Sequence, residues 1–238
     1  VMADSPILKK YPDLVARDSQ GRPCLFGFQG PTCYAVDLTA DCVEEYFVEL
    51  YGRLREWGYT FHKLDFLRAP VTAADVRFRN AKMTRAQAYR RGMALIRKAA
   101  GPDAYILACG GLYEGTVGLA DCVRSGSDTI GDWVRAGYAP DRPATLMTIK
   151  QNVWRSYTNR FWHTDPDAAM LRLRSKPFHD NSWSERLSTG RFTEEEAFTV
   201  LVNQYLGGGV TCFSERLADL QDERRAMLRY VLPPFGPA

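Results

Sequence analysis

Several features that would assign a function at once are missing from the 238-residue sequence. It has three histidines and six cysteines, but no Cys-x-x-Cys pair and no two histidines at zinc-ligand spacing. A structural zinc site is therefore not expected. The cysteines are scattered along the chain, so we expect most of them to be reduced, buried thiols rather than a disulfide framework.

Long apolar runs and a large charge are absent too. No run approaches the ~18 apolar residues of a membrane-spanning helix. The formal net charge is +3, too small to indicate binding to a nucleic acid or an anionic membrane. Hydrophobic residues make up 45% and charged residues 25%, which is typical of a soluble globular protein. We expect one soluble domain over residues 1–238, with neither a membrane nor a nucleic-acid partner.

The sequence begins Val-Met-Ala-Asp, without the basic and then apolar stretch of a secretory signal. This favours a cytoplasmic location, although we expect the true N-terminus to lie further upstream.

Strands and helices are predicted to alternate from residue 33 onward. Residues 1–30 are predicted to be loop and turn, with a short strand at 25–28. Two capping boxes, Thr84 with Gln87 and Thr193 with Glu196, mark helix starts. Further helices are expected near residues 43–57, from Pro143 to about 157, and over 217–230. Between the helices we expect strands at residues 33–38, 59–66, 105–109, 119–124, 161–163 and 210–213. Such alternation indicates a parallel sheet covered by helices.

Two folds share this pattern. A doubly wound sheet usually has a glycine-rich phosphate turn after an early strand, and the sequence has none there. A (β/α)8 barrel needs eight strands in about 250 residues, so six strands would be a barrel without its first two. The strands alone leave both folds open.

The chemistry-bearing residues follow the predicted strands, where a barrel places its active site. They are Asp37, Lys63, Asp65, Cys109, Arg124, Asp128, Asp165 and Asp167. Several aspartates that converge on one face suit metal binding or glycoside hydrolysis.

Glycoside hydrolysis needs two carboxyl groups, one ionised and one able to donate a proton. Asp65 lies two residues from Lys63, on the same strand face, and a nearby cation keeps a carboxylate ionised. Asp128 follows Arg124 by four residues and is the candidate acid, with Arg124 available for sugar hydroxyls. Plainer roles remain open, because an aspartate after a strand is often a helix cap or half of a surface salt bridge.

Two other residues have structural interpretations of the same kind. Asp165 followed by Pro166 is a good helix start. Cys109 is most simply a small buried residue.

Three segments, in order, resemble motifs of the glycoside hydrolase family 36 α-galactosidases, which are melibiase-like enzymes. They are GYTFHKLDF at residues 58–66, DCVRSGSD at 121–128 and NRFWHTDPD at 159–167. Each motif alone is a weak signal, but the ordered set is a strong one, and the resemblance extends over most of the chain.

The resemblance implies a (β/α)8 TIM barrel that lacks its first two strands, because the strand near residue 59 then becomes the fourth and the one near 119 the sixth. It implies Asp65 as the nucleophile and Asp128 as the general acid/base of a retaining enzyme, with their carboxyl groups ~5–5.5 Å apart. Lys63, Cys109 and Arg124 match positions that line the sugar subsite. Neither a metal nor an organic cofactor is implied, and the substrate is an α-galactoside oligosaccharide.

The sequence also departs from that family. It has no Asp-Asp pair at the end of a first strand, and Glu215 stands where the family usually has aspartate. We therefore expect a fragment of the catalytic barrel whose exposed sheet edges would invite association between chains, and we expect the chain by itself to be inactive.

Four other functions remain open. Two keep the barrel and change the reaction, to that of an α-N-acetylgalactosaminidase or a galactosyl transferase. The others are a non-catalytic carbohydrate-binding barrel and a magnesium-dependent phosphotransfer barrel.

Overall fold

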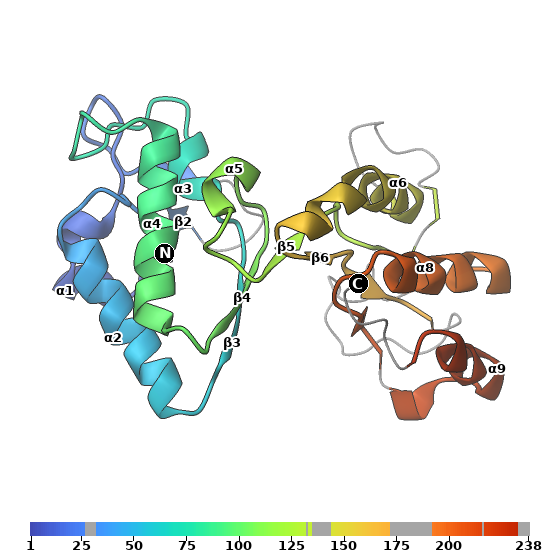
Figure 1. The fold of residues 1–238 in the computed structure, drawn as a ribbon. Coiled ribbons are helices and arrows are strands. Elements are labelled where there is room, and N and C mark those ends of the chain that lie inside the picture. Colours follow the sequence, from blue (N-terminus) through green and yellow to red (C-terminus); the bar gives the residue numbers. More distant parts are fainter. Residues whose placement is uncertain (27–31, 132, 135–143, 172–191, 216, 233–238) are drawn as a thin grey trace. The chain divides into compact units, whose positions relative to one another are not determined.

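The computed structural model describes residues 1–26, 32–131, 133–134, 144–171, 192–215 and 217–232. The chain divides into two units, Val1–Asp121 and Cys122–Ala238, drawn in blue to green and in green to red in Figure 1.

The first unit begins with short elements. Helix α1 spans Ile7–Lys10, and a 3-10 turn, η1, spans Pro12–Leu14. Strand β1 (Leu25–Phe26) pairs antiparallel with β2 (Cys33–Tyr34). The expected strand at 25–28 is thus present at its start, while residues 27 and 28 lie outside the described part of the chain.

Strand β2 is shorter than the expected strand over residues 33–38. Beyond it the chain bonds to the N-terminal segment: Asp37 N donates to Leu14 O, and Ala35 N donates to Cys24 O. This stretch is therefore extended but antiparallel to its partners.

The rest of the first unit alternates helices and parallel strands. In chain order the elements are α2 (Cys42–Glu56), β3 (Phe61–Leu64), α3 (Ala69–Thr72), α4 (Arg85–Ala100), β4 (Tyr105–Ala108) and α5 (Tyr113–Thr116). Strands β3 and β4 pair in parallel, from Phe61 opposite Tyr105 to Leu64 opposite Ala108. Helices α2 and α4 lie side by side along this pair (Figure 1).

Helix α4 begins at the capping box that its sequence predicts. Thr84 accepts from Gln87 N, and the Gln87 side chain accepts from Thr84 N, which completes the capping box. Gly101 follows Ala100 at φ 93°, a conformation that glycine adopts without a Cβ penalty. The buried face of α4 includes Tyr89, Met93 and Ile96, which are four and three residues apart, as expected of a helix that packs by one apolar face.

The second unit also contains parallel strands joined by helices. Its elements are β5 (Cys122–Arg124), α6 (Thr145–Arg155), η2 (Ser156–Arg160), β6 (His163–Asp165), β7 (Ala168–Ala169), α8 (Glu194–Leu206), β8 (Cys212–Phe213), η3 (Leu217–Asp219), α9 (Asp222–Ala226) and η4 (Met227–Tyr230). Strand β5 pairs in parallel with β6, and β7 with β8. The α/β class with parallel strands is confirmed.

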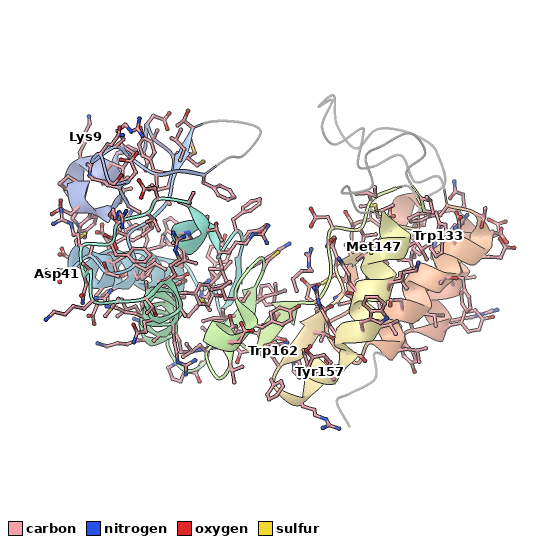
Figure 2. All side chains as sticks on the ribbon, turned by 90° about the horizontal axis from the view of Figure 1, so that it is seen from above. Lys9, Asp41, Trp133, Met147, Tyr157 and Trp162 are labelled. Carbon is pink, nitrogen blue, oxygen red and sulfur yellow. The ribbon has the colours of Figure 1, made fainter. Side chains whose placement is uncertain are left out.

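A hydrophobic core joins α8 to β7 in this unit. Leu171, Phe192 and Leu201 are buried in it, and Trp133 packs against it with its ring edge-on to Phe192. Figure 2 labels Trp133 near Met147 of α6. The second unit therefore has a core of its own.

Two predictions for this unit are wrong. The expected helix over residues 217–230 is broken, because Gln221 is extended (ψ 151°) and the buried Leu220 precedes it. The expected helix start at Asp165-Pro166 is absent, since Asp165 ends β6 and Asp167 has φ 71°. Pro143, the other predicted helix start, lies outside the described residues, and α6 is described from Thr145.

All six cysteines lie in the described part of the chain and none is in a disulfide, although only Cys24, Cys109 and Cys122 are fully buried. Among the described helices, none combines the length and apolar character needed to span a membrane.

Candidate active site

The predicted nucleophile follows β3 in the first unit. Its neighbour Phe66 has φ 53°, and Phe66 N donates to Asp65 Oδ1 at 2.8 Å. Left-handed backbone is uncommon for a bulky residue and collects at functional sites. The turn therefore holds the Asp65 carboxylate at the end of the strand.

Strand β4 supports this turn through backbone hydrogen bonds. Cys109 N donates to Leu64 O at 2.8 Å, and Cys109 O accepts from Leu67 N at 3.2 Å. Gly110 O then accepts from Arg68 N at 2.9 Å, with Gly110 at φ 65°. Cys109 is thus buried beside the end of β3, next to the segment that carries Asp65.

Lys63 and Asp65 both line a cavity of about 560 Å³ within the first unit. The rest of its wall is mostly apolar and includes residues of β2, α2, α3 and α4, among them Tyr51, Tyr89 and Met93. Both charged side chains are exposed, and neither forms an ion pair among the described residues. The cavity offers a carboxylate and an ammonium group against an apolar wall.

The second unit holds a buried arginine with three carboxylates. Arg124 of β5 stands opposite Asp165 of β6 in the parallel register. Its Nε donates to Asp165 Oδ2 at 2.7 Å, and its Nη2 lies 2.9 Å from Asp167 Oδ1. Its Nη1 donates to Asp128 Oδ1 at 3.1 Å. We call these four residues the Arg124 cluster.

The members of the cluster differ in exposure. The Arg124 side chain is 6% exposed, and Asp165 is buried as well, whereas the Asp128 side chain is 84% exposed. A buried guanidinium is costly to leave unpaired, and Arg124 has three carboxylate partners, so the loss of any one of them still leaves it paired. Arg124, Asp165 and Asp167 are therefore held in place by their ion pairs, whereas the carboxylate of Asp128 extends into solvent.

Helix α6 fixes the loop that carries Asp128, residues 125–130. Its buried Thr148 donates to Asp128 O at 3.2 Å, and its buried Thr145 accepts from Ile130 N and donates to Ile130 O. On the same face, Asn152 accepts from Ser125 Oγ at 2.7 Å. A Cβ at Gly126 would lie 2.7 Å from Asn152 Oδ1, so the loop needs glycine there.

The structure thus places predicted site residues near one another in two places, one in each unit. In the first unit, Lys63 and Asp65 line one cavity and Cys109 lies beside the end of β3; in the second unit, Arg124 contacts Asp128. Two features escape the sequence reasoning: Asp165 and Asp167 as partners of Arg124, and the polar stripe of α6. The spacing of Thr145, Thr148 and Asn152, three and then four residues apart, is the signal that could have revealed that stripe.

No protein-family model matches the chain. The α-galactosidase TtGalA from Thermus thermophilus, solved with stachyose, has a TM-score of 0.78 and 29% identity over 99% of this chain. The same enzyme with p-nitrophenyl α-D-galactopyranoside has a TM-score of 0.76 and 30% identity over 97% of it. The chain is α-galactosidase-like. The resemblance expected from the three motifs is therefore confirmed.

The α-galactosidase-like chain spans about half the length of those two chains, 48% and 44%. A more distant structure, a sulfoquinovosidase of glycoside hydrolase family 31 from E. rectale, has a TM-score of 0.61 and 13% identity over 96% of this chain. At that identity it shows a shared fold alone.

Proposed function

We propose that the protein is a retaining glycoside hydrolase that cleaves terminal α-galactosides. The observation that carries this proposal is the similarity, over 99% of the chain, to an α-galactosidase bound to stachyose. The carboxylates of Asp65 and Asp128 support it, because each follows a parallel strand and is exposed.

In this proposal the reaction has two steps. The Asp65 carboxylate attacks the anomeric carbon while Asp128 donates its proton to the departing glycosidic oxygen, so that the C–O bond breaks and a covalent glycosyl-enzyme forms. Asp128, now ionised, takes a proton from water, and the resulting hydroxide displaces Asp65 from the anomeric carbon. Galactose is released and Asp128 regains its proton.

Three further residues have proposed roles in holding the galactose. The Lys63 ammonium group lines the same cavity as Asp65 and would donate to sugar hydroxyls. Cys109 would contact the ring beside the end of β3. Arg124 would reach the sugar only through an N–H group that its carboxylate partners do not use. Its main proposed role is therefore to place Asp128, to which its Nη1 donates.

We also propose that residues 1–238 form part of a catalytic (β/α)8 barrel, with β3 as its fourth strand and β5 as its sixth. The parallel pairing of β3 with β4 and of β5 with β6 supports this proposal. This proposal includes the expectation that the first two strands of the barrel are missing from residues 1–238.

The protein, expressed from its complete open reading frame, is expected to release nitrophenol from p-nitrophenyl α-galactoside and galactose from stachyose. The rate is expected to exceed the uncatalysed rate by on the order of 10⁶-fold or more. Absorbance of nitrophenolate and chromatography of the sugars measure the two reactions.

Two parallel assays separate the alternatives. If the p-nitrophenyl α-N-acetylgalactosaminide is cleaved faster than the α-galactoside, N-acetylgalactosamine and not galactose is the preferred sugar. Longer oligosaccharides in place of free galactose would indicate transfer rather than hydrolysis. Sugar binding without turnover by the folded protein would contradict the proposal and support a carbohydrate-binding role.

A further inference from the structure

The Arg124 cluster contains a carboxylate, Asp167, to which the proposed reaction gives no role. We propose that Asp167 is a positioning residue that fixes Asp128, the proposed general acid/base, from both sides. This inference rests on the proposed function, since it assigns Asp167 to the proton-transfer half of that reaction.

Asp167 contacts the chain on both sides of Asp128. Its Oδ1 lies 2.9 Å from Nη2 of Arg124, four residues before Asp128. Its Oδ2 accepts from the amide of Thr129, the residue directly after Asp128, at 2.6 Å. One carboxylate therefore binds the side chain that contacts Asp128 and the backbone that carries it.

Asp128 depends on these contacts for its own placement. Its side chain is 84% exposed, and Arg124 is its ion-pair partner in the described part of the chain. An exposed carboxylate samples several rotamers unless a partner selects one. General acid catalysis requires the acid within hydrogen-bond reach of the leaving oxygen. The placement of Arg124 consequently governs the fraction of time that the Asp128 carboxyl group lies within hydrogen-bond reach of the leaving oxygen.

The backbone at Asp167 is consistent with such a role. Asp167 has φ 71° and lies on the short link between β6 and β7. Its own amide donates to Asp165 Oδ1 at 2.9 Å, and its carbonyl accepts from Gln204 of α8. A left-handed non-glycine residue persists where the surroundings over-determine it. Here those surroundings aim the carboxylate at Arg124 and Thr129.

Asparagine is the informative replacement at this position. It adopts left-handed backbone about as readily as aspartate, so the link between the strands is preserved. It has one acceptor oxygen where aspartate has two. Because Arg124 and the Thr129 amide are both donors, Asp167→Asn must give up one of these contacts.

Protein stability is expected to be nearly unaffected by this change. Burial raises the pKa of Asp167 and the nearby Asp128 carboxylate adds to the shift, although Arg124 and two backbone amides oppose it. A raised pKa means that the folded state holds the proton more tightly than the unfolded chain, so the ionised group disfavours folding at neutral pH. Asparagine carries no such charge, which offsets its lost contact.

The experiment compares two substrates in the wild-type protein and in Asp167→Asn. Stachyose has a poor leaving group that needs protonation, whereas p-nitrophenolate departs with little help. We expect kcat/KM for stachyose to fall by about 10- to 100-fold and kcat/KM for p-nitrophenyl α-galactoside by less than about fivefold. The unfolding temperature is expected to stay within about 4 °C of wild type.

A second readout does not depend on turnover. Hydrogen exchange at the Thr129 amide is expected to become at least about tenfold faster in Asp167→Asn, because the amide loses its acceptor for part of the time. Asp18→Asn is the matched control. Asp18 has the same 16% side-chain exposure and likewise joins an arginine, Arg22, to backbone amides, but it lies in the first unit.

The possible outcomes distinguish a failure of the role proposed for Asp167 from a failure of the proposed function. An equal loss on both substrates, or no loss, in an active protein would overturn the role of Asp167 and leave the proposed function intact. Unchanged exchange at Thr129 together with unchanged kinetics on stachyose would overturn it as well. A folded wild-type protein that hydrolyses neither substrate would overturn the proposed function and this inference together.

Discussion

Replacement of Asp65 with alanine is expected to lower α-galactoside turnover by on the order of 10⁴-fold or more, because no covalent intermediate can form without the carboxylate. The change should leave folding intact, since Asp65 is exposed and its side chain accepts one hydrogen bond, from the adjacent Phe66 amide. Steady-state kinetics with p-nitrophenyl α-galactoside measure the loss.

Added azide makes this test more specific. In Asp65→Gly, azide can enter the space of the missing carboxylate and attack the anomeric carbon directly, which inverts it and yields β-galactosyl azide. Asp222→Ala, at a 92% exposed aspartate of α9, is the matched control and should keep full activity. Asp65→Ala turnover within about tenfold of wild type would exclude Asp65 as the nucleophile.

Loss of the Asp128 carboxylate is expected to have an effect that depends on the substrate. In Asp128→Ala, kcat/KM for stachyose should fall by about 10²- to 10⁴-fold, the usual contribution of a general acid. For p-nitrophenyl α-galactoside, kcat/KM should change little while kcat falls, because the second step has lost its base. The comparison of the two substrates is the measurement.

Azide is again diagnostic for Asp128. It needs no general base, so it should restore kcat in Asp128→Ala by attack on the glycosyl-enzyme, and the product should be α-galactosyl azide. Arg124 retains Asp165 and Asp167 in this variant, so the buried cluster stays paired. A proportional loss on both substrates, without rescue, would mean that Asp128 is not the acid/base.

Local signals predicted much of the fold. The capping boxes at Thr84 and Thr193 both form, because each depends on side chains three residues apart. The alternation of strands and helices likewise predicted parallel pairs. The strand expected at 33–38 is shorter because its partners come from residues 14–24, and periodicity does not indicate which segment a strand pairs with.

The candidate site was predictable only where its residues are neighbours in sequence. Lys63 with Asp65, and Arg124 with Asp128, are two and four residues apart, and both pairs were found. The ion pair between Asp167 and Arg124 spans 43 residues and depends on the β5–β6 register, so the neighbours of these residues in sequence do not indicate it. Tertiary pairing of this kind leaves no local pattern.

The most direct test of the account is the anomeric form of the first sugar released. Proton NMR during hydrolysis of p-nitrophenyl α-galactoside distinguishes α- from β-galactose before mutarotation mixes them. A double displacement through Asp65 predicts that α-galactose appears first. If β-galactose appears first, the covalent mechanism is wrong; if the folded protein releases no galactose at all, the proposed substrate class is wrong.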